Sequence, residues 1–399
     1  MRVFIAMLII AGSGLMCAAD PLKTGPSVRA LAFSPDDKYL VATSAEPDEV
    51  GHATVWELAS GKIRFERQEP KGIPAAAFSP DGKWLVLGGF TENAVVIDTA
   101  KWAIDRQLPG HGKAARGVAF SHDGKTLAVT SYDSFVRFWN VPAWSEKKTL
   151  DNAHAGWIYA AAFSKDGKTL ATCGDDDTAK LWDLDSGKCL HTFPHGSIVR
   201  RIVFAPDDRH VVYTSWDGTL SIRARDTGKP VIEFDRFGSG DDVAVTRDAK
   251  LLAVVSGDVT VVPIDLRPAD EPTTKKIQQL MAGWDDDAIA VRDKATREIA
   301  AIGIPALPLL RQAAKDAKSP EARLRARLAR SLIQSAEPRL KLRHPEGQVQ
   351  SLAFSSDGQT LATGGADGVV RLWNVADGKE TRLLRQFPPT PPRVPRSEY

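Results

Sequence analysis

The segment Phe163-Ser164-Lys165-Asp166-Gly167-Lys168 decides the fold, because close copies of it recur along the chain. The other copies begin at Phe33, Phe78, Phe120, Phe204 and Phe354, and a degenerate copy begins at Val245. Successive copies start 45, 42, 43, 41 and 41 residues apart, and the last starts 109 residues after Val245. A fixed period of this length is typical of repeat architectures, so the chain holds seven units, with about 67 extra residues inside the sixth.

Each unit has the pattern of four short strands. In the fourth unit we expect strands over 157–164, 169–173, 179–184 and 189–193. An aspartate follows three residues after the phenylalanine position in every unit: Asp36, Asp81, Asp123, Asp166, Asp207, Asp248 and Asp357. Its carboxylate can bond the amides of a tight hairpin, and Gly82, Gly124, Gly167 and Gly358 supply the positive φ that such a turn often requires.

Two further offsets accompany the repeat. Nineteen residues after the phenylalanine position stand Ile97-Asp98, Trp139-Asn140, Trp182-Asp183, Ile264-Asp265 and Trp373-Asn374. Histidines precede that position by nine or ten residues at His111, His154, His195 and His344. Over roughly residues 20–387, apart from one insertion, this resembles the WD-repeat β-propeller family. The resemblance implies an all-β, seven-bladed β-propeller with an α-helical insertion in the sixth blade.

In that family a histidine, a hydroxyl residue, an aspartate and a tryptophan form one buried hydrogen-bond network in a blade. The resemblance implies two full sets, namely His154, Thr172, Asp176 and Trp182, and His344, Thr363, Asp367 and Trp373. Their role would be stability, because removing one member leaves buried partners unsatisfied at ~1–3 kcal/mol each. The third unit departs from the pattern with Val129 for the hydroxyl, and the fifth has Arg223 for the tryptophan.

Residues 267–337 lose the strand period and resemble a HEAT-type helical module. Leu324, Leu328 and Leu332 recur every four residues, which predicts an apolar stripe packed against neighbouring helices. The register places the helices in the turn between the third and fourth strands of blade six, so we expect them to project from that face of the ring. Between positions 311 and 330 there are seven basic residues but only two acidic ones, Asp316 and Glu321. This excess of positive charge indicates either an anion-binding face or a solvated surface.

The two ends of the sequence differ from the repeats. Residues 1–19 are typical of a signal peptide, with Arg2, an apolar run and Cys17-Ala18-Ala19, so cleavage is expected near Ala19. A retained anchor and a lipid-modified Cys17 are the alternatives. Residues 388–399 form a proline-rich tail that we expect to be disordered. The propeller would then comprise 20–266 and 338–387.

Composition excludes several classes of protein. The 399 residues are 43% hydrophobic and 26% charged, which is not the composition of a disordered polypeptide. The net charge of +2 gives no overall reason to bind nucleic acid. No Gly-x-Ser-x-Gly or His-Glu-x-x-His motif marks the mature sequence as a hydrolase. Cys173 and Cys189 would lie on strands two steps apart, about 9–10 Å, so we expect two free, largely buried thiols.

Residues four and six before the phenylalanine position, together with residues next to the turn after the second strand, should surround the central channel on the face opposite the helices. They are Arg29, Phe90, Arg116, Tyr132, Trp157, Tyr159, Arg200 and Trp216. Tryptophan, tyrosine and arginine dominate binding hot spots, although some of these side chains would instead fill gaps in imperfect blades.

The sequence thus favours an exported, periplasmic or secreted, non-enzymatic scaffold for protein partners, monomeric and without a cofactor or transmembrane span in the mature protein. The alternatives are a metal-dependent, lactonase-like propeller hydrolase, for which only Asp175 and Asp241 are candidate carboxylates, and a TolB-like periplasmic propeller.

Overall fold

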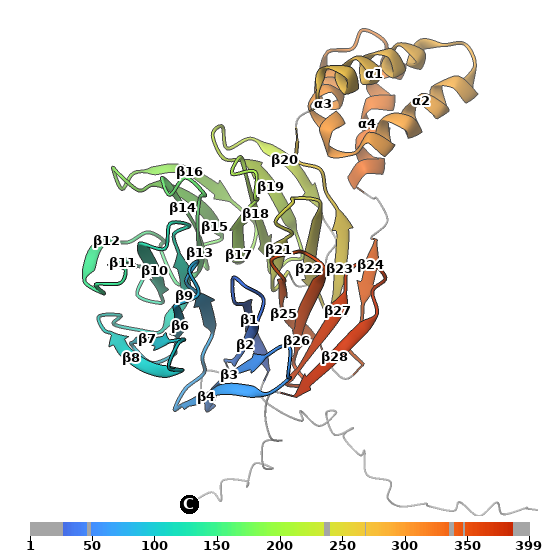
Figure 1. The fold of residues 1–399 in the computed structure, drawn as a ribbon. Coiled ribbons are helices and arrows are strands. Elements are labelled where there is room, and N and C mark those ends of the chain that lie inside the picture. The colour runs from blue at the N-terminus through green and yellow to red at the C-terminus, as the bar shows by residue number, and fades with distance from the viewer. Residues whose placement is uncertain are drawn as a thin grey trace, which may run out of the picture.

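A computed structural model describes residues 27–45, 49–234, 240–267, 269–334, 339–345 and 348–385. It contains seven four-stranded antiparallel sheets arranged as a ring (Figure 1). This confirms the seven-bladed β-propeller and its helical insertion. The predicted signal peptide over 1–19 and the predicted tail over 388–399 lie outside the described residues.

Every blade is built from four strands that are consecutive in the sequence. Blade one consists of β1 (Val28–Phe33), β2 (Tyr39–Ser44), β3 (Gly51–Glu57) and β4 (Ile63–Glu69). Blade two consists of β5 (Ala75–Phe78), β6 (Trp84–Gly88), β7 (Ala94–Asp98) and β8 (Ala103–Leu108). Blade three consists of β9 (Ala115–Phe120), β10 (Thr126–Ser131), β11 (Val136–Asn140) and β12 (Glu146–Leu150). Blades four and five consist of β13 (Ile158–Phe163), β14 (Thr169–Gly174), β15 (Thr178–Asp183) and β16 (Cys189–Pro194), and of β17 (Val199–Phe204), β18 (His210–Ser215), β19 (Leu220–Ala224) and β20 (Pro230–Phe234). Blades six and seven consist of β21 (Val243–Val245), β22 (Leu251–Ser256), β23 (Asp258–Pro263) and β24 (Leu340–Leu342), and of β25 (Val349–Phe354), β26 (Thr360–Gly365), β27 (Val369–Asn374) and β28 (Glu380–Arg385).

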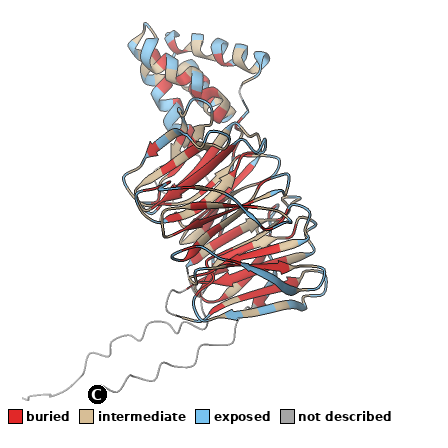
Figure 2. Cartoon of the chain, turned by 90° about the vertical axis from the view of Figure 1, so that its left-hand side faces the viewer, coloured by how far each residue is buried: buried red, intermediate tan, exposed pale blue. Residues whose placement is uncertain are grey.

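Burial falls from the inside of the ring to the outside. The first strands of neighbouring blades contact one another around the channel. The second strands are almost entirely buried, as in β14, whereas outer strands such as β8 are mostly exposed (Figure 2). The core therefore lies between the faces of adjacent blades.

The repeated segment forms the turn between the first two strands of each blade. Ser164 Oγ donates to Asp166 Oδ1 at 2.6 Å, and the Lys168 amide donates to the same oxygen at 2.9 Å. Gly167 has the positive φ that the sequence predicts, 68°. In blades one and five an aspartate takes this backbone conformation instead, with φ of 55° for Asp37 and 58° for Asp208.

Those two aspartates bond the preceding blade. The Lys165 amide donates to Asp208 Oδ1 at 2.6 Å, which joins blades four and five. The Ser356 amide donates to Asp37 Oδ1 at 2.8 Å, which joins blades seven and one. Ser351 Oγ also donates to the Val28 carbonyl at 3.3 Å, so the ring is closed by side-chain and packing contacts between two ordinary blades.

The insertion interrupts blade six between β23 and β24. It comprises α1 (Glu271–Ala282), α2 (Ile289–Ile302), α3 (Leu307–Asp316) and α4 (Pro320–Gln334), with 3₁₀ turns at Gly283–Asp285 and Ile304–Ala306. The expectation that it projects from one face is wrong, because it lies beyond the outer edge of the ring (Figures 1 and 2). Gln334 Nε2 donates to the Glu233 carbonyl at 3.0 Å, and Arg311 donates to the Val231 carbonyl. β20 is an edge strand with carbonyls that need donors, and the helices supply them.

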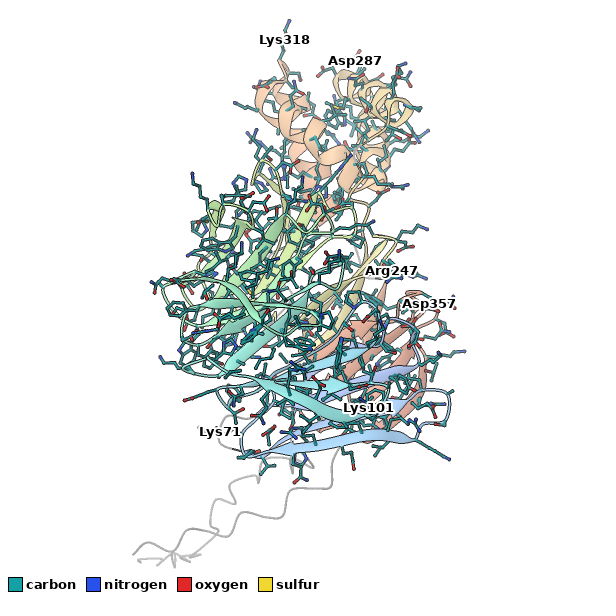
Figure 3. The ribbon with its side chains drawn as sticks, turned by 60° about the vertical axis from the view of Figure 1, so that its left-hand side comes forward. Lys71, Lys101, Arg247, Asp287, Lys318 and Asp357 are labelled. Atoms are coloured by element: carbon teal, nitrogen blue, oxygen red, sulfur yellow. The ribbon has the colours of Figure 1, made fainter. Side chains whose placement is uncertain are left out.

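The predicted leucine stripe of α4 is also wrong. Leu324, Leu328 and Leu332 are exposed, and the buried side of α4 consists of Ala322, Ala326, Ala329 and Ile333. Both sets recur at helical spacing, but alanines allow the helix axes to approach more closely. Lys318 and Asp287 mark the end of the insertion far from the ring (Figure 3).

The blade-four set of four residues forms one hydrogen-bond network. Trp182 Nε1 donates to Thr172 Oγ1 at 2.8 Å, and Thr172 Oγ1 lies 2.7 Å from His154 Nε2. His154 Nδ1 lies 2.8 Å from Asp176 Oδ1, so the imidazole carries its proton on Nδ1 and accepts from the hydroxyl on Nε2.

In blade seven an arginine enters the same network. Trp373 Nε1 and His344 Nε2 both lie 2.7 Å from Thr363 Oγ1. Arg371 Nη1 donates to His344 Nδ1 and to Asp367 Oδ2, both at 2.8 Å. The pKa of the Asp367 carboxyl falls to about 2, because hydrogen bonds from Arg371 and the Val369 amide, together with the positive charge of Arg371, outweigh its burial.

Sequence reasoning missed this basic residue, which stands two positions before the tryptophan. The ion pairs are Arg137 with Asp133 at 2.7 Å, Lys180 with Asp176 at 3.4 Å, and Arg371 with Asp367 at 2.8 Å. A basic residue seventeen positions after the phenylalanine in units three, four and seven was the available indication.

Blade three has a gap where the hydroxyl should be. Val129 occupies that position, and His111 Nε2 and Trp139 Nε1 are both buried without a hydrogen-bond partner in the described part of the protein. Burial, helped by Arg137, lowers the pKa of His111 to about 4. In blade five the arginine that replaces the tryptophan has a hydrogen-bond partner, since Arg223 Nε donates to the Tyr213 hydroxyl at 2.9 Å.

The cysteine prediction is half right. Cys173 and Cys189 are both free thiols, and burial raises the pKa of Cys173 to about 12. Cys189 is exposed rather than buried, because it begins β16, the outermost strand of its blade.

A matched pair of substitutions tests the hydroxyl position. Thr172→Val should lower the free energy of unfolding by about 2 kcal/mol, because His154 and Trp182 lose their buried partner. Val129→Thr should raise it by about 1 kcal/mol, because His111 and Trp139 gain one. Urea denaturation of the two variants and the wild type measures both changes. A stabilised Thr172→Val variant would contradict the assignment.

Stability should fall at acid pH because of His111. The folded-state pKa is about 4 against an ordinary value of 6.5, so protonation favours the unfolded state. Its contribution, on the order of 3 kcal/mol, is complete above pH 6.5 and is lost as the pH falls towards 4. We expect His111→Gln to reduce the loss of unfolding free energy between pH 7 and pH 4 by that amount, measured by urea titration at each pH. The exposed His122→Gln variant is the control and should keep the wild-type dependence.

Candidate functional site

One residue from each blade lines the mouth of the central channel. Each stands four positions before the phenylalanine position, and the seven are Arg29, Pro74, Arg116, Tyr159, Arg200, Asp241 and Gln350. Arg201 and Asp242 complete the lining of a cavity of about 40 Å³. The repeat therefore builds a seven-membered ring of side chains, which we call the mouth ring.

A β-bulge directs five of these side chains. The pairing of the first and second strands skips one residue at Arg29, Arg116, Tyr159, Arg200 and Gln350. A bulged residue is unpaired and its side chain is re-aimed relative to the strand. The irregularity at the start of the innermost strand thus gives each of these blades one position whose side chain is free to vary.

The mouth ring is positively charged. It holds three arginines and one aspartate, a formal sum of +2, and the adjacent Arg201 and Asp242 cancel. Arg200 lies 3.6 Å from Asp241, and Arg201 lies 2.9 Å from Asp242. Arg116 Nη1 donates to the Pro74 carbonyl at 3.2 Å, and its Nε is buried without a hydrogen-bond partner among the described residues.

Burial perturbs the titration of these groups. Burial lowers the pKa of Arg116; the neighbouring Tyr132 opposes this shift, and the positive charges of Arg200 and Arg29 add to it. Burial raises the pKa of Tyr159, and the positive charges of Arg200 and Arg116 offset part of that rise. Burial also raises the pKa of Asp242 although Arg201 opposes it. The mouth is therefore a poorly solvated site in which arginines repel one another.

Aromatic side chains form a rim beside the mouth ring. Trp157 stacks on Tyr132 with ring centroids 4.2 Å apart and planes 13° from parallel. Phe90 lies 5.9 Å and Tyr159 lies 6.0 Å from the Tyr132 ring. Trp216 packs against Arg200, whose guanidinium carbon is 5.4 Å from the ring centroid. Trp157 is 42% and Trp216 53% exposed.

The structure brings all eight sequence-predicted residues into one cluster. Four of them belong to the mouth ring itself, namely Arg29, Arg116, Tyr159 and Arg200. Phe90 and Trp157 contact Tyr132, whose ring in turn contacts Tyr159. Trp216 contacts Arg200. Sequence reasoning missed Pro74, Gln350, Arg201 and Asp242, of which Pro74 and Gln350 obey the same four-residue offset.

The two candidate metal carboxylates have other neighbours. Asp241 pairs with Arg200, and burial raises the pKa of Asp175. Within the described ranges there is no group of three or more His, Cys, Asp or Glu side chains placed to hold a metal ion.

The mouth lies on the face of the ring that carries the connections between blades. Lys71, from the connection between blades one and two, lies on one side in Figure 3, and Arg247 and Asp357, from hairpin turns of blades six and seven, lie on the other. Phe90 and Arg116 belong to the Lys71 side, because the Phe90 amide donates to the Gly72 carbonyl at 2.9 Å and Arg116 donates to Pro74.

Comparison with known proteins agrees with this geometry. The WD domain, G-beta repeat, matches residues 19–46, 103–140, 144–183, 187–222 and 336–374. The protein is a WD-repeat β-propeller. This WD-repeat protein is 30% identical over 115 residues to an uncharacterized WD repeat-containing protein of Synechocystis, covering 28% of its own length and 31% of the other.

Telomerase protein component 1 is also similar. The rat protein is 26% identical over 118 residues and the mouse protein 25% identical over 118 residues, in each case 30% of the WD-repeat protein. The matched stretch spans only 4% of the length of these rodent relatives.

Among the residues that the structure describes, the WD-repeat protein has no helix that is long and apolar enough to cross a bilayer.

The rim tryptophans should contribute little to stability. Trp216→Ala should change the free energy of unfolding by less than about 1 kcal/mol, because its side chain is largely exposed. Trp182→Phe should cost more, about 1–2 kcal/mol, because it removes a buried hydrogen bond to Thr172. Guanidinium chloride denaturation compares the two variants. Equal losses would show that Trp216 holds its blade together instead of forming an open surface.

Proposed function

We propose that this WD-repeat protein is a non-enzymatic scaffold that docks a protein partner on the mouth ring and its aromatic rim, outside the cytoplasm. WD repeats point to protein interaction in general, and the rim supplies a particular surface for it. The partner is expected to cover Trp157 and Trp216, and to reach the arginines between them.

The exposure of two tryptophans beside one charged pocket carries this proposal. Large aromatic side chains are mostly buried in soluble proteins, and exposed ones that cluster mark interaction sites. Tryptophan and arginine together are the residues most enriched at binding hot spots. Trp157 is held rigid by its stack on Tyr132, and Trp216 by Arg200, so little conformational entropy is lost when a partner binds.

The proposed location rests on the N-terminal sequence. Arg2, the apolar run that follows it and the small residues Ala18 and Ala19 fit a cleavable export signal. Fractionation of cells that express the full-length protein, beside a form lacking residues 2–19, tests this part alone. Equal distribution of the two forms would contradict export.

Site-directed photo-cross-linking tests the docking surface. Trp216 is replaced by p-benzoylphenylalanine in the full-length protein, cells of the source organism are irradiated, and adducts are identified by mass spectrometry. We expect one dominant protein adduct, which is lost when Trp157→Ala and Arg116→Gln are added.

The matched control carries the same photoreactive residue at Leu190. That side chain is similarly exposed, at 49%, but lies on the outer strand β16, remote from the mouth ring in its blade. The proposal fails if both positions give the same adducts, or if the Trp216 adduct survives the two substitutions.

A further inference from the structure

We propose that the mouth ring binds a carboxylate of the partner protein, presented by an acidic side group or by the partner's C-terminus, between Arg116 and Arg200. This rests on the proposed function, since it names the group that the docked partner inserts. The carboxylate would take both guanidiniums as hydrogen-bond donors while the rest of the partner covers the rim.

Two guanidiniums converge on one ring. The Arg116 guanidinium carbon lies 5.6 Å and that of Arg200 lies 5.8 Å from the centroid of Tyr159. The three residues come from the adjacent blades three, four and five, and all three occupy bulges. Both guanidiniums therefore lie close to the Tyr159 ring, and all three side chains line the same cavity.

The cavity lacks a compensating anion for one of them. Asp241 pairs with Arg200, but no ion pair is seen for Arg116 among the described residues. Its Nη1 donates to a neutral carbonyl, and its buried Nε has no partner there. Burying a charge is costly unless it is paired, so an anion that enters the mouth replaces repulsion among arginines with attraction.

The dimensions favour a carboxylate. The cavity of about 40 Å³ is about three times the ~10–15 Å³ that one water molecule needs, which suits a planar three-atom group. A tetrahedral phosphate is larger and carries more negative charge, which Asp241 and Asp242 in the same lining would repel. Guanidinium pairs with carboxylate through two parallel hydrogen bonds, and this geometry is specific.

Four fluorescent nine-residue peptides test the chemistry by anisotropy titration of the full-length protein. All are N-terminally labelled, built of glycine and serine, and carry two phenylalanines for the rim. Between these, the first has glutamate and an amidated end, the second glutamine and an amidated end, the third glutamine and a free C-terminal carboxylate, and the fourth phosphoserine and an amidated end. Either carboxylate peptide should bind roughly tenfold or more tightly than the neutral one, because hydrogen bonds between charged groups are the stronger ones.

Variants assign the preference to the mouth ring. Arg116→Gln and, separately, Arg200→Gln should reduce the preference to less than about threefold, and the control Arg209→Gln, which alters an exposed hairpin turn, should keep it. Circular dichroism and thermal melting check that each variant folds. If Arg116→Gln does not fold, NMR of the wild-type protein tests whether arginines bind the carboxylate. The glutamate peptide should shift a subset of the arginine Nε–Hε resonances, and the glutamine peptide should not.

Three results would overturn the inference: equal affinity for the charged and neutral peptides, tighter binding of the phosphoserine peptide, or a preference that survives Arg116→Gln. These results are distinct from a failure of the proposed function. If Trp216 cross-links a partner while all four peptides bind alike, docking stands and the carboxylate inference falls.

Discussion

Closure of the ring between blades seven and one is the constraint on which the rest of the structure depends. Each blade consists of four consecutive strands, so no described strand joins the two ends of the ring. Closure relies on the packing of β1 against β25 and on Asp37, which accepts the Ser356 amide. The mouth ring takes one residue from each blade, and its geometry exists only while all seven are held together. Asp37 can do this because its turn position requires a positive φ, which aspartate tolerates, while its carboxylate reaches the neighbouring blade.

The repeat separates stability from binding by position within the unit. The histidine, the hydroxyl, the tryptophan and the aspartate that follows the second strand (Asp176 in blade four) satisfy one another inside a blade, so their types are restricted. The bulged residue at the start of the innermost strand pairs with nothing in the ladder, and it varies from arginine to tyrosine to glutamine. Variation at this one position sets the charge of the channel mouth without disturbing the blade. Val129 is a structural defect in blade three because it leaves His111 and Trp139 without a hydrogen-bond partner among the described residues. Pro74 is not a defect, because the mouth-ring position that it occupies takes no part in such a network.

What the sequence could and could not predict follows from the range of the interactions. The hairpin turns are local, so the Phe163–Lys168 pattern and its copies predicted seven blades. The mouth ring followed from counting four residues back from the turn, which placed Arg29, Arg116, Tyr159 and Arg200 together. Predictions failed where burial depends on how whole elements pack against one another. The leucines of α4 are exposed because the alanines on its other side pack against the neighbouring helices. Cys189 is exposed because its strand is the outermost of the blade. The edge location of the insertion depended on carbonyls of β20, which belongs to a different blade from the one interrupted.

The basic residues of the insertion and those of the mouth ring illustrate two different uses of positive charge. In the insertion, Arg325 pairs with Asp293 and Glu321, Arg323 donates to the Ala317 carbonyl at 2.6 Å, and Arg311 caps β20. Three of the seven basic side chains between positions 311 and 330 therefore hold helices to one another or to blade five, which favours the solvated-surface interpretation over an anion-binding face. At the channel mouth the arginines come from separate blades, point into one small cavity and raise one another's cost of burial. A fold that places cations together at such a cost, at the position least needed for stability, has a site that an incoming anion stabilises.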